Sequence, residues 1–136
     1  MEFLITFRVN PEAMILTTSG VAHVDEFREM SQALIDDPRF RPGVPILIDH
    51  SSLDASVLTA TDVRAIGDFV ATIGERIGPN SIAVVVPDKL TFGFVRMGET
   101  RANQPQFDIQ IFYSLPEAVQ WLQQKPPPDS PASSPA

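Results

Sequence analysis

The segment TDVRAIGDFVATIGERIGPNSIAVVV, residues 61–86, decides the fold. Its first part carries apolar side chains at steps of three and four, which places them on one face of a helix that ends at Gly78-Pro79. These side chains are Val63, Ile66, Val70, Ile73 and Ile77. Its second part, 82–86, is an unbroken run rich in β-branched residues, which is typical of a strand covered on both faces. A helix followed directly by such a strand predicts a parallel sheet with crossover helices.

The same alternation extends outward from this segment. The apolar run 44–48 predicts another buried strand, closed by Asp49 and His50, and Gly20 is expected to break an opening β-hairpin. The predicted elements are strands at 3–9 and 14–18, a helix at 24–36, a strand at 44–48, a helix at 61–77, a strand at 82–86, a helix at 89–101, a strand at 107–113 and a last helix after 114. We therefore expect a single α/β domain of order β-β-α-β-α-β-α-β-α, with a mixed, mostly parallel five-stranded sheet covered by about four helices.

Composition agrees with one domain and excludes several classes of protein. The chain has 136 residues, of which 43% are hydrophobic, with a net charge of −7 and no cysteine. Residues 1–124 suffice for a core, whereas the Pro/Ser/Ala-rich stretch 125–136 predicts a disordered tail. The negative charge argues against nucleic acid as a partner, and the lack of cysteine removes thiol chemistry. No segment resembles a signal peptide or a membrane span, so we expect a cytoplasmic protein without membrane insertion.

The densest polar cluster, Asp49-His50-Ser51-Ser52, is not expected to form a hydrolase triad. Neighbouring residues of an extended segment point in alternating directions, so a nucleophile, a base and an acid cannot line up there. We interpret His50 as a strand-end histidine that bonds to loop backbone, and we keep an unrecognised hydrolase as the weakest hypothesis. His23 is expected at the start of a helix, away from any second ligand, and no glycine-rich loop joins a strand to a helix. The sequence therefore predicts no catalytic residue, no metal and no cofactor.

Hydroxyl side chains gather before the helix at 61–77. Thr61 is expected to cap that helix, and the other hydroxyls to satisfy loop amides. The alternative is a phosphorylation switch, because phosphate charge at a helix N-terminus can change which partner binds. The hydroxyls are Ser51, Ser52, Ser56, Thr59 and Thr61. At the last helix, Ser114 and Glu117 have the spacing of a capping box.

The helix at 89–101 has apolar residues on more than one face, namely Leu90, Phe92, Phe94, Val95 and Met97. Packing against the last helix and the terminal strand is the ordinary explanation. The alternatives are an exposed patch for a partner or for self-association, and a lipid-like ligand beneath the helix.

Several short segments together resemble the SpoIIAA-like branch of the STAS fold, a group related to CRAL-TRIO lipid-binding domains. They are Ser19-Gly20, DPRFRPG at 37–43, Leu47-Ile48-Asp49, IAVV at 82–85, FGFVRM at 92–97 and FYSLPEAVQWL at 112–122. The resemblance implies a small cytoplasmic bacterial domain that acts by binding, as anti-sigma-factor antagonists do. Phosphoregulated STAS proteins carry an Asp-Ser-Ser-Gly-type motif at the start of the second helix, where this chain has VLTATD at 57–62.

Two hypotheses of function follow. The leading one is a non-enzymatic regulatory or protein-interaction module, for which the resemblance implies an anti-sigma-like or kinase partner. The alternative is a carrier that holds a small molecule or lipid in apolar space between the helix at 89–101 and the sheet. The candidate phosphorylation or partner-binding residues are Ser51, Ser52, Thr59, Thr61, Asp88, Lys89 and Phe92.

Overall fold

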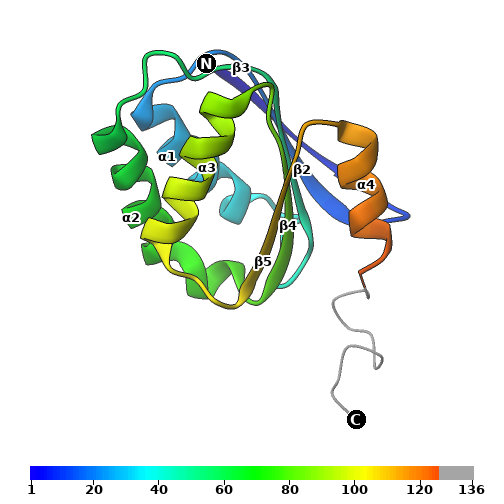
Figure 1. Ribbon diagram of the computed structural model, residues 1–136. Coiled ribbons are helices and arrows are strands. Elements are labelled where there is room, and N and C mark those ends of the chain that lie inside the picture. Colours follow the sequence, from blue (N-terminus) through cyan, green and yellow to red (C-terminus); the bar gives the residue numbers. More distant parts are fainter. Residues whose placement is uncertain (126–136) are drawn as a thin grey trace.

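The computed structural model of the chain describes residues 1–125 (Figure 1). Its elements are β1 (Glu2–Arg8), β2 (Ala13–Val21), α1 (Val24–Asp36), β3 (Ile46–Asp54), α2 (Ala60–Ile77), β4 (Asn80–Val85), α3 (Lys89–Ala102), β5 (Phe107–Phe112) and α4 (Leu115–Gln123). The predicted order of strands and helices is therefore confirmed. The predicted tail at 125–136 lies outside the described residues, apart from Lys125.

The five strands form one sheet in the order β1-β2-β3-β4-β5. β1 and β2 are antiparallel, and the remaining neighbours are parallel. Each crossover moves the chain one position along the sheet in the same direction, so the right-handed rule places α1, α2 and α3 on the same face. Figure 1 shows these three helices together on one side and α4 alone on the other. The predicted mixed, mostly parallel sheet is confirmed, and its two faces are covered very differently.

Alternation along the strands produces two separate cores. In β3, the Ile46 side chain joins the cluster beneath α1–α3, whereas Leu47 joins the cluster beneath α4. The larger cluster includes Met14, Leu16, Phe27, Met30, Leu34, Ile73, Ile77, Ile82 and Val84. The smaller cluster consists of Ala13, Leu47, Ala83, Val85, Ala118 and Leu122. Long aliphatic side chains therefore separate the sheet from three helices, and alanines let one helix approach it closely.

β3 is longer than predicted, because it continues through Asp49 and His50 as far as Asp54. The extension has a partner: β2 also continues to Val21, and the two strands pair from Ser19↔Ser52 onward. Gly20, which we expected to break the hairpin, lies inside β2 with a φ of 82°. The register shifts between Thr17 and Ser19, so a bulge absorbs the irregularity without ending the strand.

Two predicted helix caps differ from the structure. The N-cap of α2 is Thr59 and not Thr61: the Thr59 hydroxyl accepts from the amide of Asp62, and the Asp62 carboxylate accepts from the amide of Thr59. This capping box fixes the helix start two residues earlier than Thr61. At α4 the predicted box does not form, because Ser114 is the N-cap residue but its side chain makes no capping hydrogen bond.

The expected packing of the helix at 89–101 against the last helix is also wrong. α3 packs on α2, and α4 lies across the sheet from it (Figure 1). The reason is topological, since within residues 1–125 α4 does not connect β5 to a further strand and is free to turn onto the other face. α3 does contact the residue that directly follows the terminal strand, because Phe92 stacks on Tyr113.

Candidate functional site

A cavity of about 210 Å³ lies between the sheet and α1, α2 and α3. Its wall is built by β2–β5 and by all three helices of that face, with side chains such as Leu34, Ile48, Ile73, Val84 and Phe94. Most of the lining is aliphatic or aromatic, and among residues 1–125 no lysine or arginine contributes to it. The hypothesis of apolar space beneath α3 is thus consistent with the structure, and α1 and α2 contribute to the wall as well.

The size of the cavity is sufficient for a small organic molecule. An engineered cavity of about 150 Å³ lined by Leu, Ile and Phe remains dry and binds benzene. By proportion, the space beneath α1–α3 suits a ligand of about eight non-hydrogen atoms. An apolar wall favours such a ligand over water, because water needs several polar partners to enter a cavity.

His50 is one of the polar residues of this wall, together with Ser31, Thr91, Glu99 and Gln104. The side chain is 6% exposed and projects from β3 on the face covered by α1–α3. Its Nδ1 lies 2.7 Å from the hydroxyl oxygen of Thr18 on β2, and its ring meets Phe27 of α1 edge to face at 5.9 Å. We predicted a strand-end histidine bonded to loop backbone. Instead, His50 lies within the strand and bonds to a side chain.

Burial lowers the pKa of the His50 imidazole to about 4, although the charge of Asp49 acts in the opposite direction. The ring is therefore neutral at pH 7. The Asp49 carboxylate accepts a hydrogen bond from the backbone amide of Ser51 at 3.0 Å. Since adjacent strand residues point to opposite faces, Asp49 cannot orient His50 as the acid of a triad would.

Glycines allow α2 and α3 to approach closely above the cavity. A Cβ added at Gly67 would lie 2.8 Å from Cβ of Arg101 and 2.9 Å from the carbonyl oxygen of Gly98, so only glycine permits this spacing. Across the same contact, Nε of Arg101 lies 2.6 Å from Oδ1 of Asp68. α2 and α3 thus pack directly against each other where they cover the apolar space.

The predicted hydroxyl residues are placed along one edge of the molecule but have different environments. Ser51 and Ser52 are exposed residues of β3 rather than of a loop. Thr59 is engaged in the capping box of α2. Thr61 is exposed in the first turn, where its hydroxyl accepts from Arg64 at 3.3 Å. Thr61 is therefore the accessible hydroxyl at this helix N-terminus.

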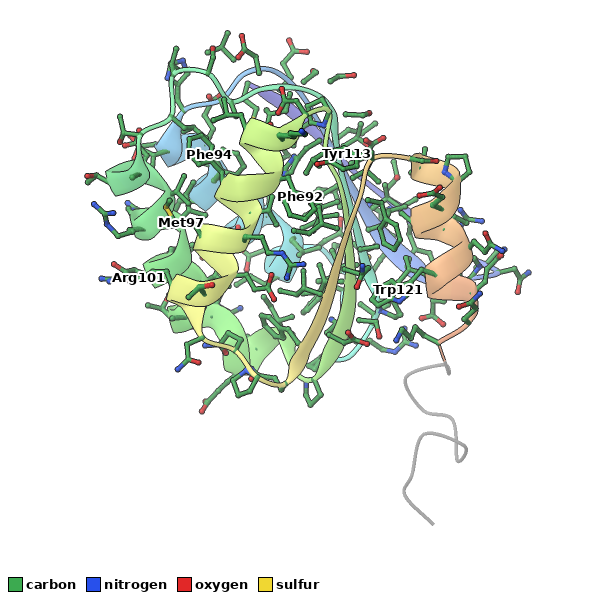
Figure 2. All side chains as sticks on the ribbon, viewed as in Figure 1. Phe92, Phe94, Met97, Arg101, Tyr113 and Trp121 are labelled. Carbon is green, nitrogen blue, oxygen red and sulfur yellow. The ribbon has the colours of Figure 1, made fainter. Side chains whose placement is uncertain are left out.

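The remaining predicted residues come from the start of α3. Asp88 caps this helix, and the amide and hydroxyl of Thr91 hold the pKa of its carboxyl below the usual value. Lys89 is exposed. Phe92 stacks on Tyr113 with ring centroids 5.8 Å apart, and Figure 2 shows the two rings side by side between α3 and the end of β5.

Exposed apolar side chains surround these residues. Val57, Leu90, Tyr113 and Leu115 are between 41% and 57% exposed, and they stand just after β3, β4 and β5. Because these strands are parallel, their carboxyl ends meet at one edge of the sheet. We call these four side chains the rim patch. Sequence reasoning identified only Leu90 of the patch as an apolar residue of interest, and no periodic signal marks the other three.

Metal-binding and membrane-spanning features are not observed in the part of the chain that the structure describes. Within residues 1–125, acidic and histidine side chains do not converge in groups of three or more. Over the same residues, no helix combines the length and the apolarity needed to cross a bilayer.

Comparison with known proteins identifies the fold. No protein-family model matches the chain, and no curated protein matches it. A solved structure from Shewanella loihica PV-4, described as an uncharacterized protein from the DUF3478 family with a SpoIIAA-like fold, is similar. The two chains are 18% identical, with a TM-score of 0.56, and the match covers 89% of this chain and 92% of that one. The relation to CRAL-TRIO domains stays a prediction. The chain has the SpoIIAA-like fold that its sequence predicted.

Proposed function

We propose that this protein binds a small apolar molecule in the cavity beneath α1–α3 and catalyses no reaction on it. The observation that carries the proposal is the cavity itself, about 210 Å³ lined mainly by aliphatic and aromatic side chains. A ligand that occupies this space in the folded protein only would stabilise the fold by mass action.

The ligand class follows from the wall. A body of about eight non-hydrogen atoms, such as a substituted benzene ring or a short branched chain, matches the volume. A phosphate or a carboxylate of the ligand would be buried without a cation, since the described wall contains no lysine or arginine. A cationic ligand would have to compete with Arg96 for Glu99, the acidic residue of the wall, because the two side chains are already ion-paired at 3.9 Å. We therefore infer a neutral ligand.

Binding can be tested with toluene as a probe, followed through the methyl resonances of the protein by NMR. We expect saturable shifts confined to residues of the wall. Ala102, which lines the cavity and is 6% exposed, provides the critical variant: Ala102→Leu places additional carbon atoms in the space and should abolish the shifts. Ala71→Leu makes the same chemical change on the exposed surface of α2 and should leave binding unchanged. Wild-type protein without saturable shifts, or equal binding by both variants, would contradict the proposal.

A second candidate function is docking of a protein partner at the rim patch. Its specific support is the presence of four exposed apolar side chains around the predicted residues Thr61, Asp88, Lys89 and Phe92. A regulatory role and a cytoplasmic location belong to this second proposal. Asp54, the last residue of β3, and Asp88, the N-cap of α3, lie near enough to interact, so the patch has a negative border that favours a partner with basic residues around an apolar centre.

Site-specific crosslinking in the native host tests this second function. A photo-crosslinking amino acid at Leu90 should capture one defined protein, and the same group at Leu4, which is 61% exposed on β1, serves as the control. Thr61→Glu adds a negative charge beside the patch and should change the yield at Leu90 if phosphorylation regulates docking. Equal capture at Leu90 and Leu4 would show that the rim patch has no special affinity.

A further inference from the structure

The hydrogen-bond chain around His50 specifies the protonation of its ring. The Thr18 hydroxyl has two neighbours, Nδ1 of His50 at 2.7 Å and the carbonyl oxygen of Asp49 at 3.3 Å. A carbonyl oxygen only accepts, and a hydroxyl has a single hydrogen. Both contacts are satisfied together when Thr18 donates to Asp49 and Nδ1–H of His50 donates to Thr18. A neutral ring with its hydrogen on Nδ1 has a bare acceptor at Nε2.

Nε2 is an unpaired acceptor that His50 contributes to a wall whose other polar residues are Ser31, Thr91, Glu99 and Gln104. It lies at the end of the ring farthest from the strand, on the face where α1–α3 enclose the space, and within residues 1–125 no donor reaches it. Nε2 is not among the fully buried atoms that lack a partner in residues 1–125, so it keeps accessible surface through which a ligand can reach it. A ligand hydrogen directed at Nε2 would give this acceptor a partner.

We propose that Nε2 of His50 accepts a hydrogen bond from the ligand, so that the cavity selects neutral molecules with an apolar body and one hydroxyl group, an alcohol or a phenol. This inference rests on the proposed function, because it assigns a specificity to the same cavity. The Thr18 hydroxyl acts as a positioning group that holds the ring in the accepting tautomer.

The wall also discriminates against carboxylic acids. Glu99 is the acidic residue of the wall. Its Oε2 is buried without a hydrogen-bond partner and lies 3.9 Å from Nη1 of Arg96, which is not a lining residue, so a ligand carboxylate beside Glu99 would meet a like charge. A neutral imidazole with a bare nitrogen cannot donate to a carboxylate either. An alcohol or phenol avoids both conflicts.

Three matched probes test the selection. p-Cresol and p-xylene have the same shape and differ by a hydroxyl in place of a methyl, and p-toluate replaces the hydroxyl by a carboxylate. In the variant His50→Phe the ring volume and the contact with Phe27 are retained, but the acceptor is lost. We expect the preference for p-cresol over p-xylene to fall about tenfold in this variant, with little change in p-xylene affinity, and p-toluate to bind neither protein.

A measurement on unaltered protein covers the case in which His50→Phe does not fold. In ¹⁵N-histidine NMR, Nε2 of His50 should carry the shift of an unprotonated ring nitrogen and should move on addition of p-cresol but not of p-xylene. If neither probe binds wild-type protein, the proposed function and this inference both fail. If both probes bind but the preference is independent of His50, or Nε2 is protonated in the free protein, the cavity function stands and this inference is overturned.

Discussion

The two faces of the sheet are packed differently against the helices that cover them. On one face, Ala118 of α4 belongs to the same buried cluster as Ala13 and Ala83 of the sheet, and none of the three has exposed surface. On the other face three helices stand on longer side chains, and a space of about 210 Å³ is left between them and the sheet. The same strands build both faces. The difference separates a tightly packed face beneath α4 from a face that leaves the space in which we propose a ligand binds.

The largest effect on stability is expected from truncating a buried side chain on the face of the sheet that α4 covers. Leu122 is 2% exposed in the cluster beneath α4, and Leu122→Ala should reduce the free energy of unfolding by about 3–4 kcal/mol. Leu115→Ala, in the same helix but 41% exposed, should cost less than about 0.5 kcal/mol. Urea unfolding of both variants measures the difference. Similar losses for the two would show that α4 is not tightly packed on the sheet.

A pH-dependent loss of stability of similar size is expected from the face that α1–α3 cover. Burial lowers the pKa of His50 to about 4, against about 6.5 in the unfolded chain, so the unfolded state binds more protons between these values. Stability is then complete above pH 6.5, falls as the pH decreases, and has lost about 3 kcal/mol by pH 4. Urea unfolding of wild-type protein and of His50→Phe at pH values between the two pKa values measures this loss of stability. Parallel pH profiles for the two proteins would contradict the buried, neutral ring.

A third comparison adds the same side chain to each face. Ala118→Leu overfills the buried cluster beneath α4 and should reduce the free energy of unfolding by about 2 kcal/mol. Ala102→Leu projects into the cavity and should change stability by less than about 1 kcal/mol, because the added carbons occupy empty space. Thermal unfolding of the unliganded proteins separates the two. An equal penalty at both positions would mean that the α1–α3 face has no room.

The smallest effects on stability are expected at glycines of α2 and α3. A methyl at Gly67 would approach the Gly98 carbonyl within 2.9 Å, so Gly67→Ala should force α2 and α3 apart and cost about 1 kcal/mol. Gly93 has nothing within 4 Å of an added Cβ, and Gly93→Ala should gain about 0.5 kcal/mol from helix propensity. Opposite signs in chemical denaturation are expected. A gain at both positions would argue against the close helix contact.

The elements of the fold were predictable because their patterns are local. The stripe from Val63 to Ile77 and the run at 82–86 encode a helix and a central strand without reference to the rest of the chain. The errors arose where a distant partner decided the outcome. Asp49 and His50 look like a strand end, but the extension of β2 to Val21 supplies hydrogen bonds that continue β3. Thr59 and Thr61 are both suitable caps, and Asp62 selects Thr59 because it is three residues further on.

The candidate site was predictable only in part. The apolar residues of α3 suggested space for a ligand, but the volume depends on how side chains from seven elements fit together, which no pattern in one segment records. His50 was considered as a catalytic base and as a structural residue. Its place in the cavity wall depends on the pairing of β2 with β3, which brings Thr18 to its Nδ1.

The most direct test of the central claim is a crystal of the protein exposed to xenon under pressure. Xenon enters apolar cavities that are large enough and leaves close-packed cores unoccupied. We predict strong xenon density between α1–α3 and the sheet, within contact of Ile82 and Val84, and none beneath α4. Absence of xenon from the α1–α3 face would contradict the account, because the space proposed to hold the ligand would not be accessible to an atom that requires nothing but room.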